Sequence, residues 1–423
     1  MLTATFMQLV DVSIVNVAIP SIQRDLHASY AAIQFVVAGY QMAFAASLVT
    51  AARLGDIFGR RRLFLIGMAG FTAASALCAA APSAQVLVAG RVLLGLMSGV
   101  MFPQVLSVIQ VVFPAEGRAR AFAVLGAVVG LATITGPLAG GGLIAWDLAG
   151  LSWRLIFYVN VPVGALALSA AFARLPESRS PDRPRLDLPG ALLVTVALLM
   201  VVYPLTEGRQ LGWPAWSFAV LASSLVVFAG FAAHQRRRTR SGRWPLVHTS
   251  LFKDRAFVAG LVLTVVFFSG VPAFFLVTTL YLQFGFGFSA LHAGLTTFPF
   301  AVGTALGSAA SEPLTGRLGK QVLQLGAAAL VLAMGVVMLS ASQGPTLSSL
   351  QLLPGFVLAG VGVGLVVAPN ANLILAGIRS EAAGSASGVL STGQQVGGVL
   401  GIALVGVFFF GLLSSSAPAA ARA

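Results

Sequence analysis

Thirteen long runs of mainly apolar residues constrain this chain more than any other feature of its sequence. A helix needs about 20 such residues to cross the hydrocarbon core of a bilayer. Only 9% of the residues are charged, against about 25% in a typical soluble domain. The sequence therefore predicts an all-α polytopic membrane protein. With polar or turn-rich interruptions as helix ends, we expect spans at about residues 2–20, 31–52, 63–81, 84–112, 118–146, 154–174, 187–205, 214–233, 256–283, 290–312, 321–341, 347–369 and 388–411.

Basic residues are divided unevenly between the two sides of these spans. With a cytoplasmic N-terminus, twenty of the 25 Lys and Arg residues fall on the cytoplasmic side, where positive charge is retained. These twenty are Arg53, Arg60, Arg61, Arg62, Arg118, Arg120, Arg174, Arg179, Arg183, Arg185, Arg236, Arg237, Arg238, Arg240, Arg243, Lys253, Arg255, Arg317, Lys320 and Arg379. Four lie outside (Arg24, Arg154, Arg209, Arg422), as do Trp146, Trp153, Trp213 and Trp216 at the expected outer helix ends. The net charge of +13 is thus interpreted as a topology signal. Nucleic-acid binding is not expected, because the densest cluster, at 234–245, is a short predicted loop.

Two long polar loops divide the chain. We expect an N-terminal six-helix bundle over residues 1–175, two inserted helices and a basic loop over 176–249, and a C-terminal bundle of five helices over 250–423. The turn GRLGK at 316–320 repeats weakly the turn GDIFGRRR at 55–62. Such repeats are typical of transporters that carry one central site between two bundles.

Asp11 is the only one of the 12 acidic residues that lies well inside a predicted span, and Arg91 is the only basic one. Intramembrane carboxylates cost about 2.5–3.5 kcal/mol to insert and are typical of ion or proton pathways. Asp11 is expected about 14 Å from the cytoplasmic end of its helix and Arg91 about 10 Å from the outer end of its own. In a core about 30 Å thick they then differ in depth by about 6 Å and can pair if their helices are neighbours. The pair either handles protons or only braces helix packing.

Three further sets of residues are candidates. The turn at 55–62 combines Asp56 with flexible glycines and three arginines, which suits a gating loop or merely retained positive charge. The segment 130–142 lets helices approach closely and bend, as a hinge or as plain packing. Uncharged polar residues either line a cavity or bond between helices. The residues are, for the loop, Gly55, Asp56, Gly59, Arg60, Arg61 and Arg62; for the hinge, Gly136, Pro137, Gly140 and Gly141; for the cavity, Asn16, Tyr40, Gln41, Gln104, Asn370 and Gln394.

Other chemistry is not expected. The four histidines have no ligand spacing and Cys78 is the single cysteine, so neither a metal site nor a disulfide is predicted. No phosphate-binding GxxxxGK[ST] segment occurs in the sequence. No cofactor is expected, and a proton gradient would supply the energy for active transport.

Five segments together resemble one family. DVSIVNVAIP at 11–20, ARLGDIFGRRR at 52–62, RVLLGLMSG at 91–99, GPLAGG at 136–141 and GSASGVLSTGQQVGGVLGIAL at 384–404 are similar to motifs of the drug/proton antiporters of the major facilitator superfamily. The branch concerned has fourteen helices, so the last one is apparently missing from the thirteen counted here. The resemblance implies proton coupling at Asp11 and Arg91, gating by the 55–62 loop, and an exporter-type motif at Gly136–Gly141.

The expected function is proton-coupled export of hydrophobic or amphipathic small molecules across the cytoplasmic (inner) membrane. Its partners would be these substrates, protons and the lipid bilayer, and a periplasmic adaptor is left open. A facilitator or symporter of another solute shares the fold and stays an alternative. A membrane enzyme or scaffold would need a catalytic cluster, and the loops offer none.

Overall fold

The computed structural model describes residues 1–179, 186–208, 211–288, 290–342, 348–379 and 382–416, and their secondary structure is helical with no strand. Each of the thirteen predicted runs contains a helix, so the predicted all-α membrane fold is confirmed. The long helices are α1 (Leu2–Asp25), α2 (Tyr30–Phe58), α3 (Arg60–Ala79), α4 (Ala84–Val112), α5 (Ala115–Trp146), α7 (Asn160–Arg174, preceded by the short α6, Leu155–Tyr158), α8 (Leu188–Glu207), α9 (Ala215–Arg240), α10 (Arg255–Leu280), α11 (Ala290–Leu318), α12 (Gln321–Ala341), α13 (Ser349–Ala376) and α14 (Ala383–Ser416).

Eleven helices in the part of the chain that the structure describes are long and apolar enough to cross a membrane, and α5 makes a twelfth if its two bent halves are one span. The halves, Gly117–Ala132 and Ile134–Trp146, meet at 41°. Pro137 lies four residues after the break at position 133 and has no N–H to donate to that residue's carbonyl. The bend therefore has a local cause in the sequence.

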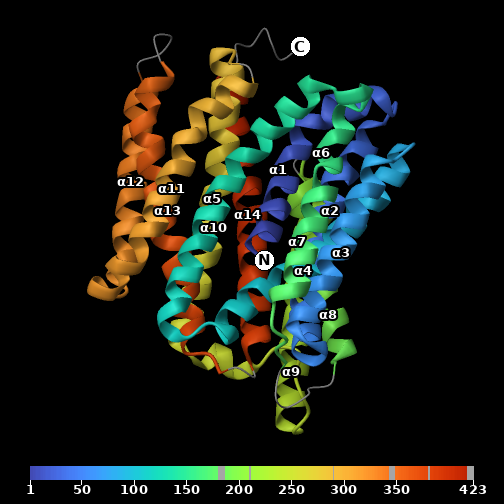
Figure 1. Cartoon of the computed structure of the whole chain (residues 1–423), viewed down its shortest axis with the longest axis vertical. Helices are drawn as coiled ribbons and strands as arrows, with labels where there is room; N and C mark the ends of the chain where they lie inside the picture. Colours follow the sequence, from blue (N-terminus) through green and yellow to red (C-terminus); the bar gives the residue numbers. More distant parts are fainter. Residues whose placement is uncertain (180–185, 209–210, 289, 343–347, 380–381, 417–423) are drawn as a thin grey trace.

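The helices form two bundles, α1 to α7 and α10 to α14; Figure 1 shows α2, α3 and α7 on one side, α11, α12 and α13 on the other, and α5, α10 and α14 between them. The bundles meet where α5 packs along α11 and α13, and where α14 packs along α2 and α4. Helices α8 and α9 pack on each other and rest against α2 and α14 through α8. The exact boundaries at residues 175 and 249 stay a prediction.

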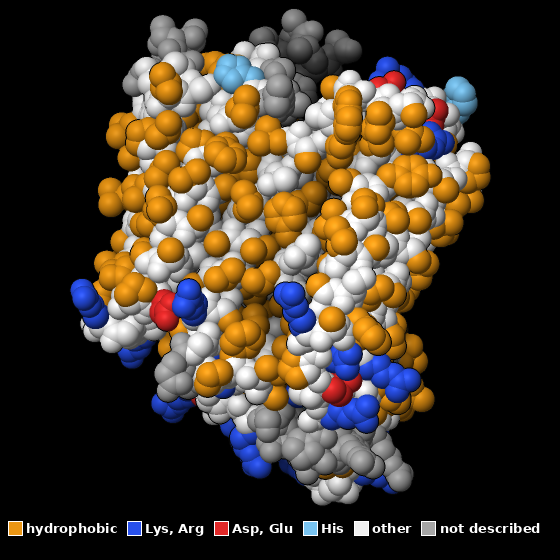
Figure 2. Space-filling view, viewed as in Figure 1, with side chains coloured by type: hydrophobic (Ala, Val, Ile, Leu, Met, Phe, Trp, Pro, Cys, Tyr) orange, Lys and Arg blue, Asp and Glu red, His pale blue; other side chains and the backbone are white. Residues whose placement is uncertain are grey.

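Most of the surface in view is apolar, and Lys and Arg side chains gather near one end of the molecule (Figure 2). We call this the basic end; it holds the junction of α2 with α3 and the last turns of α9 and α11. An apolar band between polar ends is what a bilayer requires of a spanning protein.

Three sequence expectations about loops and ends are wrong. Helix α9 continues to Arg240, so the basic cluster is partly helical rather than a loop; Gln and Arg favour helices, and arginines complement the negative end of the helix dipole. The segment 53–62, which lies between two expected spans, is helical except at Gly59. Trp153 is fully buried, and its indole N–H donates to Asp25 at 3.0 Å instead of facing an interface.

Candidate functional site

The residues Asp11 of α1 and Arg91 of α4 lie together inside the first bundle. The Arg91 Nη1 donates to Asp11 Oδ2 at 2.5 Å, and each residue is 1% exposed. The Arg91 Nε donates to the carbonyl of Val36 at 2.9 Å, while Asn160 Nδ2 donates to Asp11 Oδ1 at 3.4 Å. The pair that the sequence allowed is thus formed, and both partners have further polar contacts as buried charges require.

The depth expected for Asp11 rests on counting residues from the start of its helix. The N-terminus lies at about mid-height of the molecule rather than at one of its two ends (Figure 1). Counting residues from Leu2 therefore does not measure the distance of Asp11 from a membrane face. The pair forms because α1 and α4 are neighbours.

Tyr40 of α2 completes the cluster, and it is a core residue rather than a cavity-lining one. Its ring centroid lies 4.4 Å from Arg91 Cζ, a cation–π distance. Its hydroxyl donates to Ser98 Oγ at 3.0 Å and accepts from Gln8 Nε2 at 3.3 Å. We call Gln8, Asp11, Tyr40, Arg91, Ser98 and Asn160 the polar cluster.

Small residues of α4 bring Tyr40 close to Arg91. A Cβ on Gly95 would lie 2.3 Å from the Tyr40 carbonyl oxygen, and one on Gly99 would lie 1.8 Å from Ser47 Oγ. Only glycine allows α2 and α4 to approach so closely. Asn160 is not among the residues predicted from the sequence, although an amide inside the apolar run 154–174 is an available signal.

Asp56 forms a second buried charge cluster at the basic end. Its Oδ1 accepts from Arg60 Nη2 at 2.7 Å and its Oδ2 lies 3.6 Å from Arg53 Nη1. All three residues are at most 1% exposed. Gly59 has φ of +108°, which only glycine adopts freely, so α3 can start one residue after α2 ends. Asp56 therefore ties the α2–α3 junction together and does not cap α3.

The other residues predicted for the 55–62 loop have separate places. Gly55 leaves room for the side chain of Gln104, whose amide donates to the Ala51 carbonyl at 2.9 Å. Arg61 donates to the Phe172 carbonyl at 2.6 Å, so it joins α3 to α7. Arg62 is exposed. Gln104 is thus an interhelical brace, and its assignment to a cavity is wrong.

The glycines predicted as a hinge are not equivalent. Cβ atoms on Gly136 and Gly140 would meet Ser13 Oγ at 1.8 Å and Ile14 Cγ1 at 2.8 Å, both on α1, whereas one on Gly141 would meet nothing within 4 Å. The motif therefore seats α5 closely on α1 through two of its glycines.

The remaining predicted cavity residues differ in their burial. Asn370 is buried and donates to Thr264 Oγ1 at 2.8 Å within the second bundle. Asn16 is exposed, and Gln41 and Gln394 are half-buried. Asn16, Gln41 and Gln394 stay candidates for contact with a substrate.

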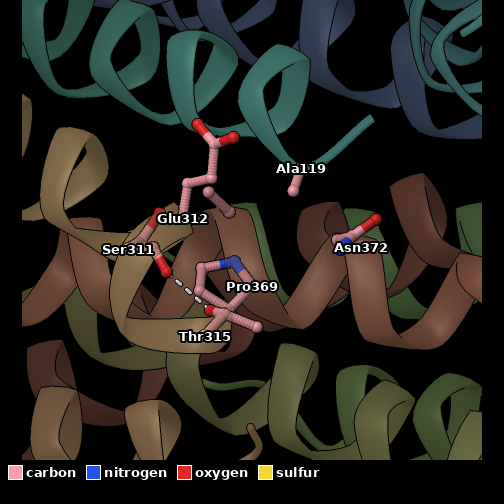
Figure 3. A pocket seen from close by; sticks show the side chains of 7 residues that line it. Ala119, Ser311, Glu312, Thr315, Pro369 and Asn372 are labelled. Carbon is pink, nitrogen blue, oxygen red and sulfur yellow. Dashed lines mark hydrogen bonds between the residues drawn. The ribbon is translucent and has the colours of Figure 1, made fainter. Parts of the chain in front are cut away.

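A small hollow lies between the bundles, lined by α5, α11 and α13 (Figure 3). Its volume is about 10 Å³, about enough for one water molecule. Glu312 of α11 lines it, and its carboxylate points toward the ribbon of α5. Helix α11 runs six residues beyond its predicted end at 312. Glu312 therefore lies inside this helix rather than at its end.

No group of three or more His, Cys, Asp or Glu side chains gathers anywhere in the described ranges. The geometry instead offers two buried ion-pair clusters in one bundle, one of them next to the second bundle. A buried ion pair that gains or loses a proton changes the charge of its surroundings by one unit, which suits coupling between ion movement and conformation.

The sequence model of the Major Facilitator Superfamily matches residues 1–402. The chain belongs to this superfamily. Superfamily relatives of this chain include the probable actinorhodin transporter of Streptomyces coelicolor, 40% identical over 420 residues, 99% of this chain and 73% of the relative. The tetracenomycin C resistance and export protein of Streptomyces glaucescens is 35% identical over 94% of this chain and 72% of its own length. The puromycin resistance protein of Streptomyces alboniger is 35% identical over 96% and 79%.

The superfamily fold is also seen in solved structures. The proton:xylose symporter XylE matches 98% of this chain and 88% of its own with a TM-score of 0.66 at 15% identity. The human organic anion transporter MFSD10 matches 96% and 92% with a TM-score of 0.65 at 16% identity. At such identities the likeness concerns the fold, and it confirms the superfamily architecture.

Proposed function

We propose that this superfamily member exports hydrophobic or amphipathic drug-like molecules in exchange for protons, by alternating access of its two bundles. Export of this substrate class is supported by the names of its relatives, which are a probable actinorhodin transporter, a tetracenomycin C resistance and export protein, and a puromycin resistance protein. The observation that carries the coupling part is the buried contact between Asp11 and Arg91.

The proposed coupling follows from charge. With Asp11 ionised, the Asp11–Arg91 pair is neutral; a proton on Asp11 leaves the buried Arg91 charge without its counter-ion. An uncompensated buried charge is strongly unfavourable, so protonation favours any arrangement that repositions Arg91 or admits water. Tyr40 and the Val36 carbonyl hold Arg91 in place while it is paired with ionised Asp11. We propose no enzymatic activity and no cofactor, and we propose that the proton gradient supplies the energy.

The proposed location is the cytoplasmic membrane, with the basic end facing the cytoplasm and α1 running from its N-terminus toward the outer side. The excess of Lys and Arg at one end supports this orientation. Substrates, protons and lipid are the proposed partners.

Transport into inside-out vesicles tests the proposal. Vesicles with an acidic interior should accumulate ethidium or radiolabelled puromycin, and a protonophore should abolish the accumulation. Asp11→Asn should lower this accumulation at least tenfold while substrate exchange without a gradient persists, because Asn retains the shape of the side chain and loses the titrating group.

Asp254→Asn is the matched control, since Asp254 caps α10 through the Ala256 N–H at 2.8 Å and asparagine caps equally well. It should transport like the parent. Undiminished gradient-driven accumulation by Asp11→Asn would refute the coupling role. Uptake driven by the opposite gradient would instead identify a symporter.

A further inference from the structure

The inserted helices α8 and α9 are fastened to each other by one buried carboxylate at the basic end. Asp187, at the N-cap of α8, is fully buried. It accepts from the Gly190 N–H at 3.1 Å and from Gln235 Nε2 at 2.9 Å, and His234 Nε2 lies 3.0 Å away. Arg238 Nη1 lies 3.4 Å from the same carboxylate. Asp187 thus fixes the last turns of α9 against the start of α8.

Gln235 extends this connection to the chain beyond α9. While its amide nitrogen binds Asp187, its Oε1 accepts from the backbone N–H of Leu246 at 2.7 Å and of Val247 at 3.3 Å. Gln235 is 2% exposed, so water does not replace these bonds easily. Arg238 Nε adds a bond to the Trp244 carbonyl at 3.2 Å. The segment 241–248 is therefore held by side chains of α9.

The same segment contacts both bundles. Ser385, in the first turn of α14, donates its hydroxyl to the Leu246 carbonyl at 3.0 Å. Arg53 of α2 lies over the Trp244 ring with its Cζ 5.9 Å from the centroid. Leu246 and Val247 belong to the apolar core that also contains residues of α2, α4, α13 and α14.

These contacts end at the place where the bundles meet at the basic end. A Cβ on Gly384 would lie 2.2 Å from Asp56 Oδ2, so α14 starts directly against the Asp56 cluster. Segment 241–248 contacts Arg53 on one side of this meeting point and Ser385 on the other. The segment therefore links α2 to α14 at this end of the molecule.

We infer that Asp187 and Gln235 are positioning residues of the transport cycle, which act through segment 241–248 to hold α14 against α2 and keep the basic end closed. The inserted pair is then a part of the closure. This inference rests on the proposed transport cycle, but its test needs no substrate and no proton gradient.

Thiol labelling in inside-out vesicles tests the inference. Cys78 is the single cysteine and is buried, so Cys78→Ala gives a background without cysteine. Ser387→Cys places a reporter on α14, at a fully buried position one turn from Gly384. A membrane-impermeant maleimide should label this cysteine slowly in the parent. With Gln235→Ala the labelling rate should rise at least fivefold.

Two variants separate positioning from general damage. Gln235→Glu places a second carboxylate against Asp187 and should label as fast as Gln235→Ala. Combining it with Asp187→Asn exchanges donor and acceptor, restores the bond, and should return the rate to within about twofold of the parent. Ser223→Ala is the matched control on α9, because the Ser223 hydroxyl donates to the Ala219 carbonyl one turn earlier in the same helix, and it should leave the labelling rate unchanged.

Ser385→Ala is a second test that remains available if changes at Gln235 prevent folding. It removes only the hydrogen bond between α14 and the Leu246 carbonyl of segment 241–248. It should raise labelling about two- to threefold. Parent-like labelling of both Gln235→Ala and Ser385→Ala overturns the inference. The inference is also overturned if the double variant with Gln235→Glu and Asp187→Asn labels as fast as Gln235→Glu alone. If labelling behaves as expected while no substrate is exported, the proposed function fails and the closure by α8 and α9 stands.

Discussion

Gly384 is the position where an added methyl group should most directly oppose closure of the basic end. An alanine Cβ there would lie 2.2 Å from Asp56 Oδ2 and 2.5 Å from both Cγ and Oδ1. The carboxylate cannot move away freely, because Arg60 binds it at 2.7 Å and Arg53 lies at 3.6 Å, all of them buried. Either α14 moves away from α2 or the Asp56 cluster is disrupted.

The expected size of the effect follows from overpacking. Extra methyl groups in a well-packed core cost about 1–3 kcal/mol. The gain in helix propensity from Gly to Ala, about 1 kcal/mol, is the same in both conformations and cancels between them. A net cost of about 2 kcal/mol in the closed form alone shifts the balance toward the open form roughly thirty-fold.

The labelling rate of Ser387→Cys in the Cys78→Ala background measures this shift. Gly384→Ala should raise it roughly ten- to thirty-fold when opening and closing are fast relative to labelling, because the rate then follows the population of the open form. Gly398→Ala, on the same helix, is the matched control, since its Cβ would meet Pro272 Cγ at 3.6 Å, an ordinary contact. A parent-like rate for Gly384→Ala, with the protein folded, would refute the close contact between Gly384 and Asp56.

Two further predictions concern stability in detergent. Burial raises the pKa of Asp187, but the hydrogen bonds from His234, Gln235 and the Gly190 N–H outweigh it and hold the pKa below its usual value. The ionised group thus stabilises the fold above the unfolded pKa near ~3.9 and ceases to do so as the pH falls through the folded pKa. Thermal denaturation should show Asp187→Asn costing about 1–3 kcal/mol at pH 7 and progressively less as the pH falls below the unfolded pKa; a constant difference would contradict this. Gly136→Ala should lower stability by about 1–3 kcal/mol because of Ser13, and Gly141→Ala should not; equal losses would show that the α1–α5 contact is misplaced.

Apolar patterning predicted the helices well because spanning a bilayer leaves few alternatives. Each predicted run became a helix, since backbone groups in lipid must be satisfied within the segment. The ends were less predictable: α9 reaches Arg240 because arginine favours a helix that polarity alone would end, and α11 reaches Leu318 although its last turns contain Pro313 and Gly316. Spacing along the chain also pointed to Asp11 and Arg91, because charges inside spans are rare.

The sequence by itself determined the membrane fold, the superfamily and the two isolated charges, since these follow from apolar runs, motifs and the cost of burying charge. Only the tertiary structure decided that Tyr40 and Gln104 are core residues, that Glu312 lies in a helix beside a hollow, and that Gln235 joins α9 to segment 241–248. These results depend on which helix faces meet. Glycines such as Gly95 set that meeting by close approach, and a packing contact between distant residues leaves no local signal in the sequence.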